Sequence, residues 1–195
     1  KNLARDMYVL NGWAVHHNIS IWREAYPSDG FVYWFFWNMS GPWLCNHIWE
    51  HYLYTKDIDF LKKYYPILKG SATFCSEWLV ENSEGELVTP VSTSPENAYL
   101  MPDGISASVC EGSTMDIAII RSLFSNTINA SKILQTDSLF CAELTQKVNK
   151  LKKYQIGSKG QLLEWDKEYM ENEPQHRHVS HLFGLYPGCD ITDYT

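Results

Sequence analysis

Two short segments of this 195-residue chain combine side-chain types that suit chemistry on a polar ligand. The first, Ser92-Thr-Ser-Pro-Glu-Asn97, places a carboxyl group directly after a proline. The second, Gln175-His-Arg-His-Val-Ser-His181, holds three imidazoles and one guanidinium about eighty residues later. A proton-donating acid, Arg and His donors for hydroxyl groups and flat aromatic faces are what cleavage of a glycosidic bond requires. Sugar chemistry is therefore the first hypothesis.

Glu96 is the candidate proton donor. Pro95 fixes its own φ and restricts Ser94 to extended conformations, while the surrounding Ser, Thr and Asn side chains brace turns by bonding local backbone. The alternative is structural: the same residues would cap a helix, with Glu96 in its first turn. An acid must be protonated to donate, so we expect Arg177 to lie away from this carboxyl group.

Arg177 and His178 are candidate sugar-binding residues. A guanidinium forms paired hydrogen bonds, and His178 and His181 share a face if the segment is helical. Zinc is the alternative, because both His-x-His and His-x-x-His can ligate it, but no Cys or carboxylate completes the set at a diagnostic spacing. We expect hydrogen bonding to a polar ligand, with no metal and no other cofactor.

Further candidates lie in the first fifty residues. His16 and His17 are adjacent, so in an extended chain one faces a cleft and the other the core. His47 and His51 are interpreted as part of an ordinary helix face. We expect two or three of the clustered tryptophans to line a cleft; these are Trp13, Trp22, Trp34, Trp37, Trp43 and Trp49.

Acidic residues elsewhere have simpler interpretations. The run Glu164-Trp-Asp-Lys-Glu168 precedes the His-rich segment and is a candidate source of a second carboxylate, but we favour a solvated acidic run. Asp116 follows Ser113-Thr114 and is interpreted as an acid in the first turn of a helix, where it suits the helix dipole.

Composition limits the function classes. The net charge is −7 and no basic stripe is present, which argues against nucleic acid as a partner. No apolar run reaches membrane-spanning length. The five cysteines have no Cys-x-x-Cys spacing, so buried free thiols are expected. The chain has no initiating Met or signal peptide, and we expect a piece of a longer parent protein, itself secreted, periplasmic or extracellular.

Hydrophobic periodicity predicts an all-α chain with long loops and minor strands. Helices are expected over 2–10, about 42–55, 57–63, 66–82, 113–134, 137–151 and 178–186. A long structured loop is expected over 11–41, a short strand within 85–91, and a loop over 92–112. Helix pairs with long functional loops suggest one partial domain, residues 1–195, from the middle of an (α/α)6 toroid. The unpaired apolar faces of such a piece would favour self-association.

Five motifs occur in the order seen in glycoside hydrolase family 95, and the chain resembles that family almost from end to end. They are Gly12-Trp-Ala-Val-His-His-Asn18, Gly41-Pro-Trp-Leu-Cys-Asn-His-Ile-Trp-Glu-His-Tyr52, Ser92-Thr-Ser-Pro-Glu-Asn97, Ser113-Thr-Met-Asp116 and His176-Arg-His-Val-Ser-His-Leu-Phe-Gly-Leu-Tyr-Pro-Gly188.

The resemblance implies an (α/α)6 barrel and an inverting α-L-fucosidase that hydrolyses terminal α-1,2 linkages of fucosylated oligosaccharides. By position in the motifs, Glu96 would be the general acid, and Arg177 and His178 would contact sugar hydroxyls. His16, His17 and Trp34 fall in segments that line the family's pocket.

The family's base, an Asn activated by an Asp, belongs to segments outside residues 1–195, so we expect the isolated chain to be inactive. The alternatives are an α-L-galactosidase, another (α/α)6 glycosidase or phosphorylase, or a carbohydrate-binding fragment without catalysis.

Overall fold

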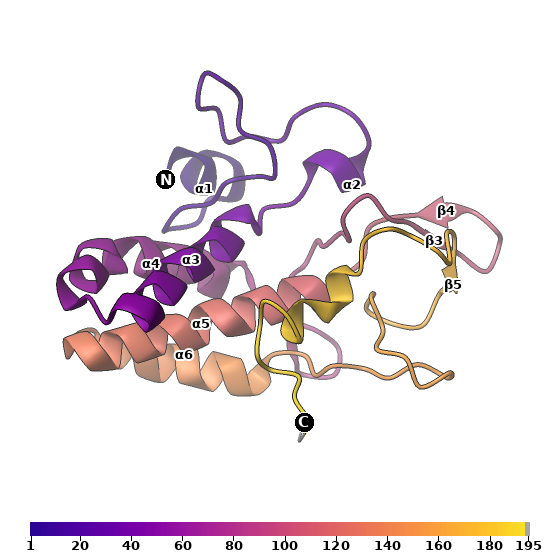
Figure 1. The fold of residues 1–195 in the computed structure, drawn as a ribbon. Helices are drawn as coiled ribbons and strands as arrows, with labels where there is room; N and C mark the ends of the chain where they lie inside the picture. The colour runs from indigo at the N-terminus through magenta and orange to yellow at the C-terminus, as the bar shows by residue number, and fades with distance from the viewer. Residues whose placement is uncertain (194–195) are drawn as a thin grey trace.

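The computed structural model describes residues 1–193, and Figure 1 shows that this part of the chain is mostly helical. Its α-helices are α1 (Asn2–Tyr8), α2 (Val32–Phe35), α3 (Ser40–Thr55), α4 (Ile58–Trp78), α5 (Thr114–Leu134) and α6 (Ser138–Lys150), and η1 (Ser180–Gly184) is a 3₁₀ helix. The strands have two residues each: β1 (Val80–Glu81), β2 (Leu87–Val88), β3 (Tyr99–Leu100), β4 (Ser106–Ala107) and β5 (Met170–Glu171). The predicted all-α class is confirmed, and the described residues do not close a barrel.

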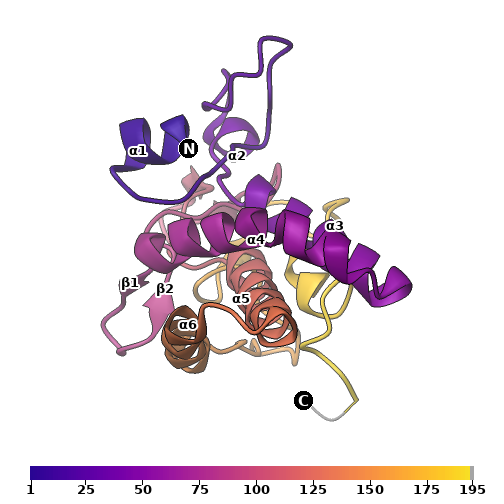
Figure 2. The ribbon, with the colours of Figure 1, turned by 90° about the vertical axis from the view of Figure 1, so that its left-hand side faces the viewer.

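Helix α5 is the centre of the molecule. It packs against α3, α4, α6 and η1, and in Figure 2 it lies beneath the crossing α3–α4 layer. Burial on all sides explains this position, since the neighbouring residues Ile117, Ile119 and Ile120 point in different directions and are all buried. Ser113 caps the helix, accepting a hydrogen bond from the backbone N–H of Asp116. The first turn of α5 is thereby fixed at the end of the bundle that carries the long loops (Figure 1).

Helix α4 corrects one prediction. The sequence suggested two helices divided near Pro66, but a single helix runs from Ile58 to Trp78 with this proline inside it. Pro66 lies on the exposed side, where the lost backbone hydrogen bond faces solvent. Leu61 and Leu68, on either side of it, are completely buried, and this continuous apolar stripe keeps the helix in one piece.

The remaining elements were predicted only in outline. The 178–186 segment forms a shorter 3₁₀ helix, and the short helix α2 lies inside the predicted 11–41 loop. The expected strand within 85–91 is β2, which pairs antiparallel with β1. The range 92–112, predicted to be a loop throughout, contains β3 and β4. Strand β3 lies between β4 and β5, antiparallel to both, because its second pairing partner comes from residues 170–171 far along the chain.

Trp13 anchors the first long loop to the helical layer. Its backbone N–H donates to the Gly70 carbonyl at 3.2 Å and its indole N–H to the Ile67 carbonyl at 2.9 Å. A Cβ atom at Gly41 would lie 2.6 Å from the indole, and one at Gly70 would lie 2.7 Å from it. Only glycine leaves room for the ring between α3 and α4, so these residues fix where the loop carrying His17 begins.

None of the helices in residues 1–193 is both long and apolar enough to cross a membrane. Cys45, Cys75, Cys110 and Cys141 are buried free thiols, as predicted, whereas Cys189 is a free thiol that is exposed.

Candidate active site

Glu96 sits at the tip of a closed turn. The Asn97 N–H donates to the Ser94 carbonyl at 3.2 Å, which places Pro95 and Glu96 at the two central positions. Glu96 has φ +54°, a left-handed conformation that the second central position of a type II turn requires and that Gly normally occupies. The turn is not the beginning of a helix, so the helix-cap alternative is wrong. A strained non-Gly residue at this tip is typical of a functional site.

The turn is tied to the segment around α2. The Glu96 N–H donates to the Tyr33 carbonyl at 3.4 Å, and the Thr93 hydroxyl donates to the Phe36 carbonyl at 3.1 Å. Ser94 and Thr93 are almost completely buried. The loop that carries Glu96 is therefore built into the protein, although the carboxyl side chain itself is one-third exposed.

Arg177 corrects an expectation. Its guanidinium contacts the Glu96 carboxylate as an ion pair instead of lying away from it. His178 Nε2 lies 3.5 Å from the same carboxylate oxygen. Burial, together with the nearby charges of Arg177 and His176, lowers the pKa of His178. Arg177 favours the ionised form of Glu96, whereas proton donation needs the neutral form.

A cavity of about 400 Å³ opens in front of the turn. This volume lies in the range of small-ligand pockets. Six aromatic or apolar residues line it, namely Tyr33, Trp37, Trp43, Pro95, Met115 and Val179. The five polar residues of the lining are His17, Thr93, Glu96, His178 and Ser180. Among the described residues that line it, Glu96 is the only carboxylate. An apolar cavity with one acid and two imidazoles suits a ligand with both a hydrophobic face and hydroxyl groups.

The two neighbouring histidines separate as their spacing predicted. His17 lines the cavity, and its Nδ1 lies 2.5 Å from the Trp34 carbonyl. His16 is completely buried between the Tyr8 hydroxyl and the Phe35 carbonyl, at 2.6 and 3.1 Å from its ring nitrogens. Burial lowers the pKa of His16. The structure therefore makes His16 a core histidine and does not place it in the cavity wall.

Two of the six clustered tryptophans line the cavity, as predicted, but Trp34, which the resemblance to the family had placed at the pocket, is not one of them. Trp37 and Trp43 line the cavity, whereas Trp34 stacks edge-on against Phe31 and Tyr33. Trp34 thus supports the wall through its backbone carbonyl and is not part of the wall itself. Tyr33, Met115 and Ser180 were missed, because nothing in local spacing shows which neighbours of a motif face a cavity formed by distant segments.

Asp116 is more than an acid in the first turn of α5. It is fully buried and accepts hydrogen bonds from the Ser92 hydroxyl at 2.6 Å and the Trp37 indole at 3.1 Å. Thr89 adds a longer one at 3.4 Å. Burial raises the pKa of Asp116 to about 6, although these three donors act in the opposite direction. The Asp116 carboxyl group therefore holds both Trp37, in the cavity wall, and Ser92, at the start of the loop that carries Glu96.

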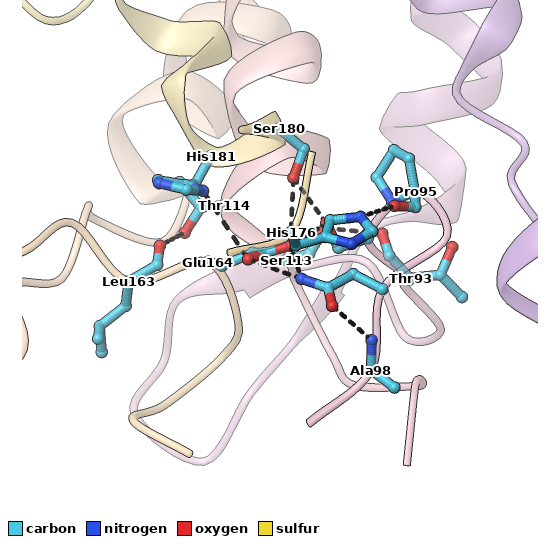
Figure 3. A network of polar contacts seen from close by, with 12 residues as sticks. Thr93, Pro95, Ala98, Ser113, Thr114, Leu163, Glu164, His176, Ser180 and His181 are labelled. Carbon is cyan, nitrogen blue, oxygen red and sulfur yellow. Dashed lines mark hydrogen bonds and ion pairs between the residues drawn. The ribbon is translucent and has the colours of Figure 1, made fainter. Parts of the chain in front are cut away.

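Glu164 belongs to the polar network around Ser180 and His176 that Figure 3 shows. Its carboxylate accepts hydrogen bonds from Ser94 and from Asn97, the latter at 3.0 Å, and only 17% of the side chain is exposed. The predicted solvated run is therefore wrong for Glu164, although Glu168 is exposed. His176, with 5% of its side chain exposed, adds a contact from Nε2 to the Pro95 carbonyl at 3.2 Å.

No group of three or more His, Cys, Asp or Glu side chains within residues 1–193 is arranged to hold a metal ion. His176 and His178 instead lie ring edge to ring face at 5.3 Å, and each faces the acid turn.

Comparison with known proteins identifies the family to which this site belongs. The family model described as the glycosyl hydrolase family 95 catalytic domain matches residues 1–195. The chain belongs to glycosyl hydrolase family 95. It is 43% identical over 194 residues to alpha-L-fucosidase 2 of Arabidopsis thaliana, covering 98% of this chain and 23% of that protein. It is 30% identical over 188 residues to probable alpha-fucosidase A of Aspergillus niger, covering 93% of this chain and 23% of that protein.

The chain thus spans about a quarter of the length of these curated relatives. The predicted family is confirmed. Within this part of the catalytic domain, the loops at one end of the helices line the cavity that contains Glu96.

Proposed function

We propose that this chain is the central part of the catalytic domain of an inverting α-L-fucosidase, with Glu96 as its general acid. The observation that carries the proposal is the placement of Glu96, on a strained turn with buried ends at the wall of an aromatic cavity. Two relatives whose names state fucosidase activity support the substrate class. The substrate would be a fucosylated oligosaccharide with a terminal α-1,2 linkage.

In this proposal the sugar ring occupies the cavity and Glu96 gives its proton to the glycosidic oxygen as the bond to C1 breaks. The rings of Trp37 and Trp43 and the side chain of Met115 offer apolar surface to the methyl group of fucose. Hydroxyl groups of the sugar would accept hydrogen bonds from Arg177 and compete with the Glu96 carboxylate for it. Arg177 is well exposed, so its movement away from Glu96 costs little packing.

An inverting enzyme also needs a base roughly 6.5–9.5 Å from the acid, with water between them. Glu96 is the only carboxylate among the described residues of the cavity wall. We propose that chain outside residues 1–195 contributes the base, in keeping with the resemblance to the family.

Substrate choice and stereochemistry test this proposal in the full-length parent protein. We expect hydrolysis of an aryl α-L-fucoside, slower hydrolysis of the matching α-L-galactoside, and a β-configured sugar as the first product by NMR. The apolar wall offers no hydrogen bond to the extra hydroxyl group of L-galactose, which explains the expected preference. A faster reaction with the galactoside would overturn the fucose assignment, and an α-configured first product would overturn inversion.

A further inference from the structure

We propose that Glu164 is a positioning residue that holds the turn carrying the proton donor. This inference rests on the proposed role of Glu96. The Glu164 carboxylate accepts a hydrogen bond from the Ser94 hydroxyl and two from the Asn97 amide, at 3.0 and 3.2 Å. Ser94 and Asn97 are the first and last residues of the turn, so one carboxylate holds both of its ends.

The same carboxylate connects the turn to the segment that follows His178. Ser180 Oγ lies 2.6 Å from Ser94 Oγ and 3.5 Å from Glu164. The single hydroxyl hydrogen of Ser94 points to Glu164, so the Ser180 hydroxyl must donate to Ser94. This series of hydrogen bonds, from Ser180 to Ser94 to Glu164, therefore fixes the position of the Glu96 turn relative to the start of η1.

The backbone of Glu164 is itself fixed. Its carbonyl accepts from the Thr114 N–H at 3.0 Å, and the Leu163 carbonyl accepts from the Thr114 hydroxyl at 2.5 Å. The next residue, Trp165, is buried and packs edge-on against Tyr99. Glu164 therefore transmits the position of the first turn of α5 to the Glu96 turn.

The contacts suit a carboxylate, because both of its oxygens face hydrogen-bond donors of the turn. An ionised carboxylate only accepts hydrogen bonds, and it faces donors from Ser94 and Asn97. A glutamine at position 164 would exchange one acceptor oxygen for an NH₂ group and lose one of these bonds. Glu164 does not line the cavity in front of the Glu96 turn, and both of its oxygens accept hydrogen bonds from the turn.

Leaving-group dependence in the full-length parent protein distinguishes positioning of the acid from a general structural role. Dinitrophenolate leaves from a dinitrophenyl fucoside without being protonated, whereas the lactose leaving group of fucosyllactose needs a proton from Glu96. We expect Glu164→Gln to lower kcat on fucosyllactose about 10- to 100-fold, as misplacement of a catalytic group does, and to leave kcat on the dinitrophenyl fucoside near that of the wild type. Equal losses on both substrates would overturn the proposal.

Two comparisons sharpen the test. Glu168→Gln is the matched control, because Glu168 accepts hydrogen bonds from Ser158 and Gln161 in its own loop, and we expect wild-type rates from it. If Glu164 acts through Glu96, the Glu96→Gln, Glu164→Gln double variant is no slower than Glu96→Gln alone. Multiplicative losses would instead give Glu164 an independent role and contradict the proposal.

Amide hydrogen exchange tests the positioning role of Glu164 without any measurement of enzyme activity. The Asn97 N–H closes the turn, so loosening the turn exposes it to exchange. We expect Glu164→Gln to speed its exchange about tenfold or more and Glu168→Gln to leave it unchanged. Unchanged exchange in Glu164→Gln would refute positioning, whereas a wild-type protein inactive on all fucosides would refute only the proposed function.

Discussion

At the scale of single residues, Glu96 combines an unfavourable backbone conformation with the position that chemistry needs. Its positive φ costs a non-Gly residue about 1 kcal/mol or more. The Ser94 carbonyl, the Tyr33 carbonyl and the buried Thr93 hold the turn in this conformation. A residue chosen for stability at this point would be Gly, so the glutamate is best explained by its carboxyl group.

A pair of variants measures this strain. Glu96→Gly and Glu96→Ala both remove the carboxyl group and its ion pair with Arg177, but only Gly relieves the positive φ. We expect the Gly variant to be more stable than the Ala variant by about 1 kcal/mol in chemical denaturation, with both inactive. An Ala variant as stable as the Gly variant would mean that the turn carries no strain.

The sequence predicted the environment of individual residues correctly where it depends only on neighbouring positions in the chain. The proline before Glu96 correctly predicted a turn, and the adjacency of His16 and His17 correctly predicted that one faces a cleft and the other the core. The Arg177–Glu96 contact and the burial of Glu164 were not predictable, because each depends on segments about eighty and seventy residues apart in the chain. The resemblance to the family singled out Trp34, whereas Trp37 and Trp43 line the cavity, because the position of a segment does not tell which ring of an aromatic cluster faces inward.

At the scale of elements, the first turn of α5 is the frame of the site. Asp116 holds Ser92 and Trp37 from it, and Thr114 holds the backbone that carries Glu164. Asp116, in the first turn of α5, and Glu164, whose backbone is bonded to that turn, therefore both hold the loop that carries Glu96. Sequence periodicity predicted α5 itself almost to the residue, since 113–134 was expected and 114–134 is observed. It could not predict the continuous α4, because only tertiary packing overrides the helix-breaking tendency of Pro66.

The buried Asp116 predicts a pH dependence of stability. Its folded pKa of about 6 exceeds its ordinary value of 3.8, so the folded state binds the proton more tightly than the unfolded state. Its contribution to stability is complete below about pH 4 and is lost as the pH rises to about 6. The whole change amounts to about 3 kcal/mol, an order-of-magnitude figure.

Asp116→Asn isolates this effect, because the amide does not titrate. We expect the wild type to lose stability relative to the Asn variant between about pH 4 and pH 6, and the difference to stay constant above that range. Unfolding free energies or melting temperatures of the full-length parent protein at several pH values provide the measurement. A difference independent of pH would show that Asp116 is ionised throughout.

At the scale of the whole molecule, residues 1–193 have a packed core but also many exposed large apolar side chains. Trp22 and Tyr186 are 78% and 84% exposed, and Tyr54 and Leu139 are more so. These side chains come from loops and helices far apart in the chain, which fits a unit that packs against further protein. The predicted toroid explains such faces, although the described helices do not form a closed ring.

We therefore predict that the isolated 195-residue chain self-associates. Light scattering after size exclusion should give a mass well above 22.6 kDa at micromolar concentration. Replacing Trp22 and Tyr186 by Ser should shift the mass toward the monomer, whereas Lys62→Ser, an exposed polar control, should not. A monomeric wild-type chain would contradict the prediction.

The central claim is that Glu96 supplies the proton in fucoside cleavage. The most direct measurement is release of L-fucose from fucosyllactose by the full-length parent protein and by its Glu96→Gln variant, which keeps the shape of the side chain but has no acidic proton. We predict release by the parent and a loss of about 100-fold or more in the variant, with fucose binding retained in both. Equal release by parent and variant would mean that another residue donates the proton and would contradict the assignment of Glu96.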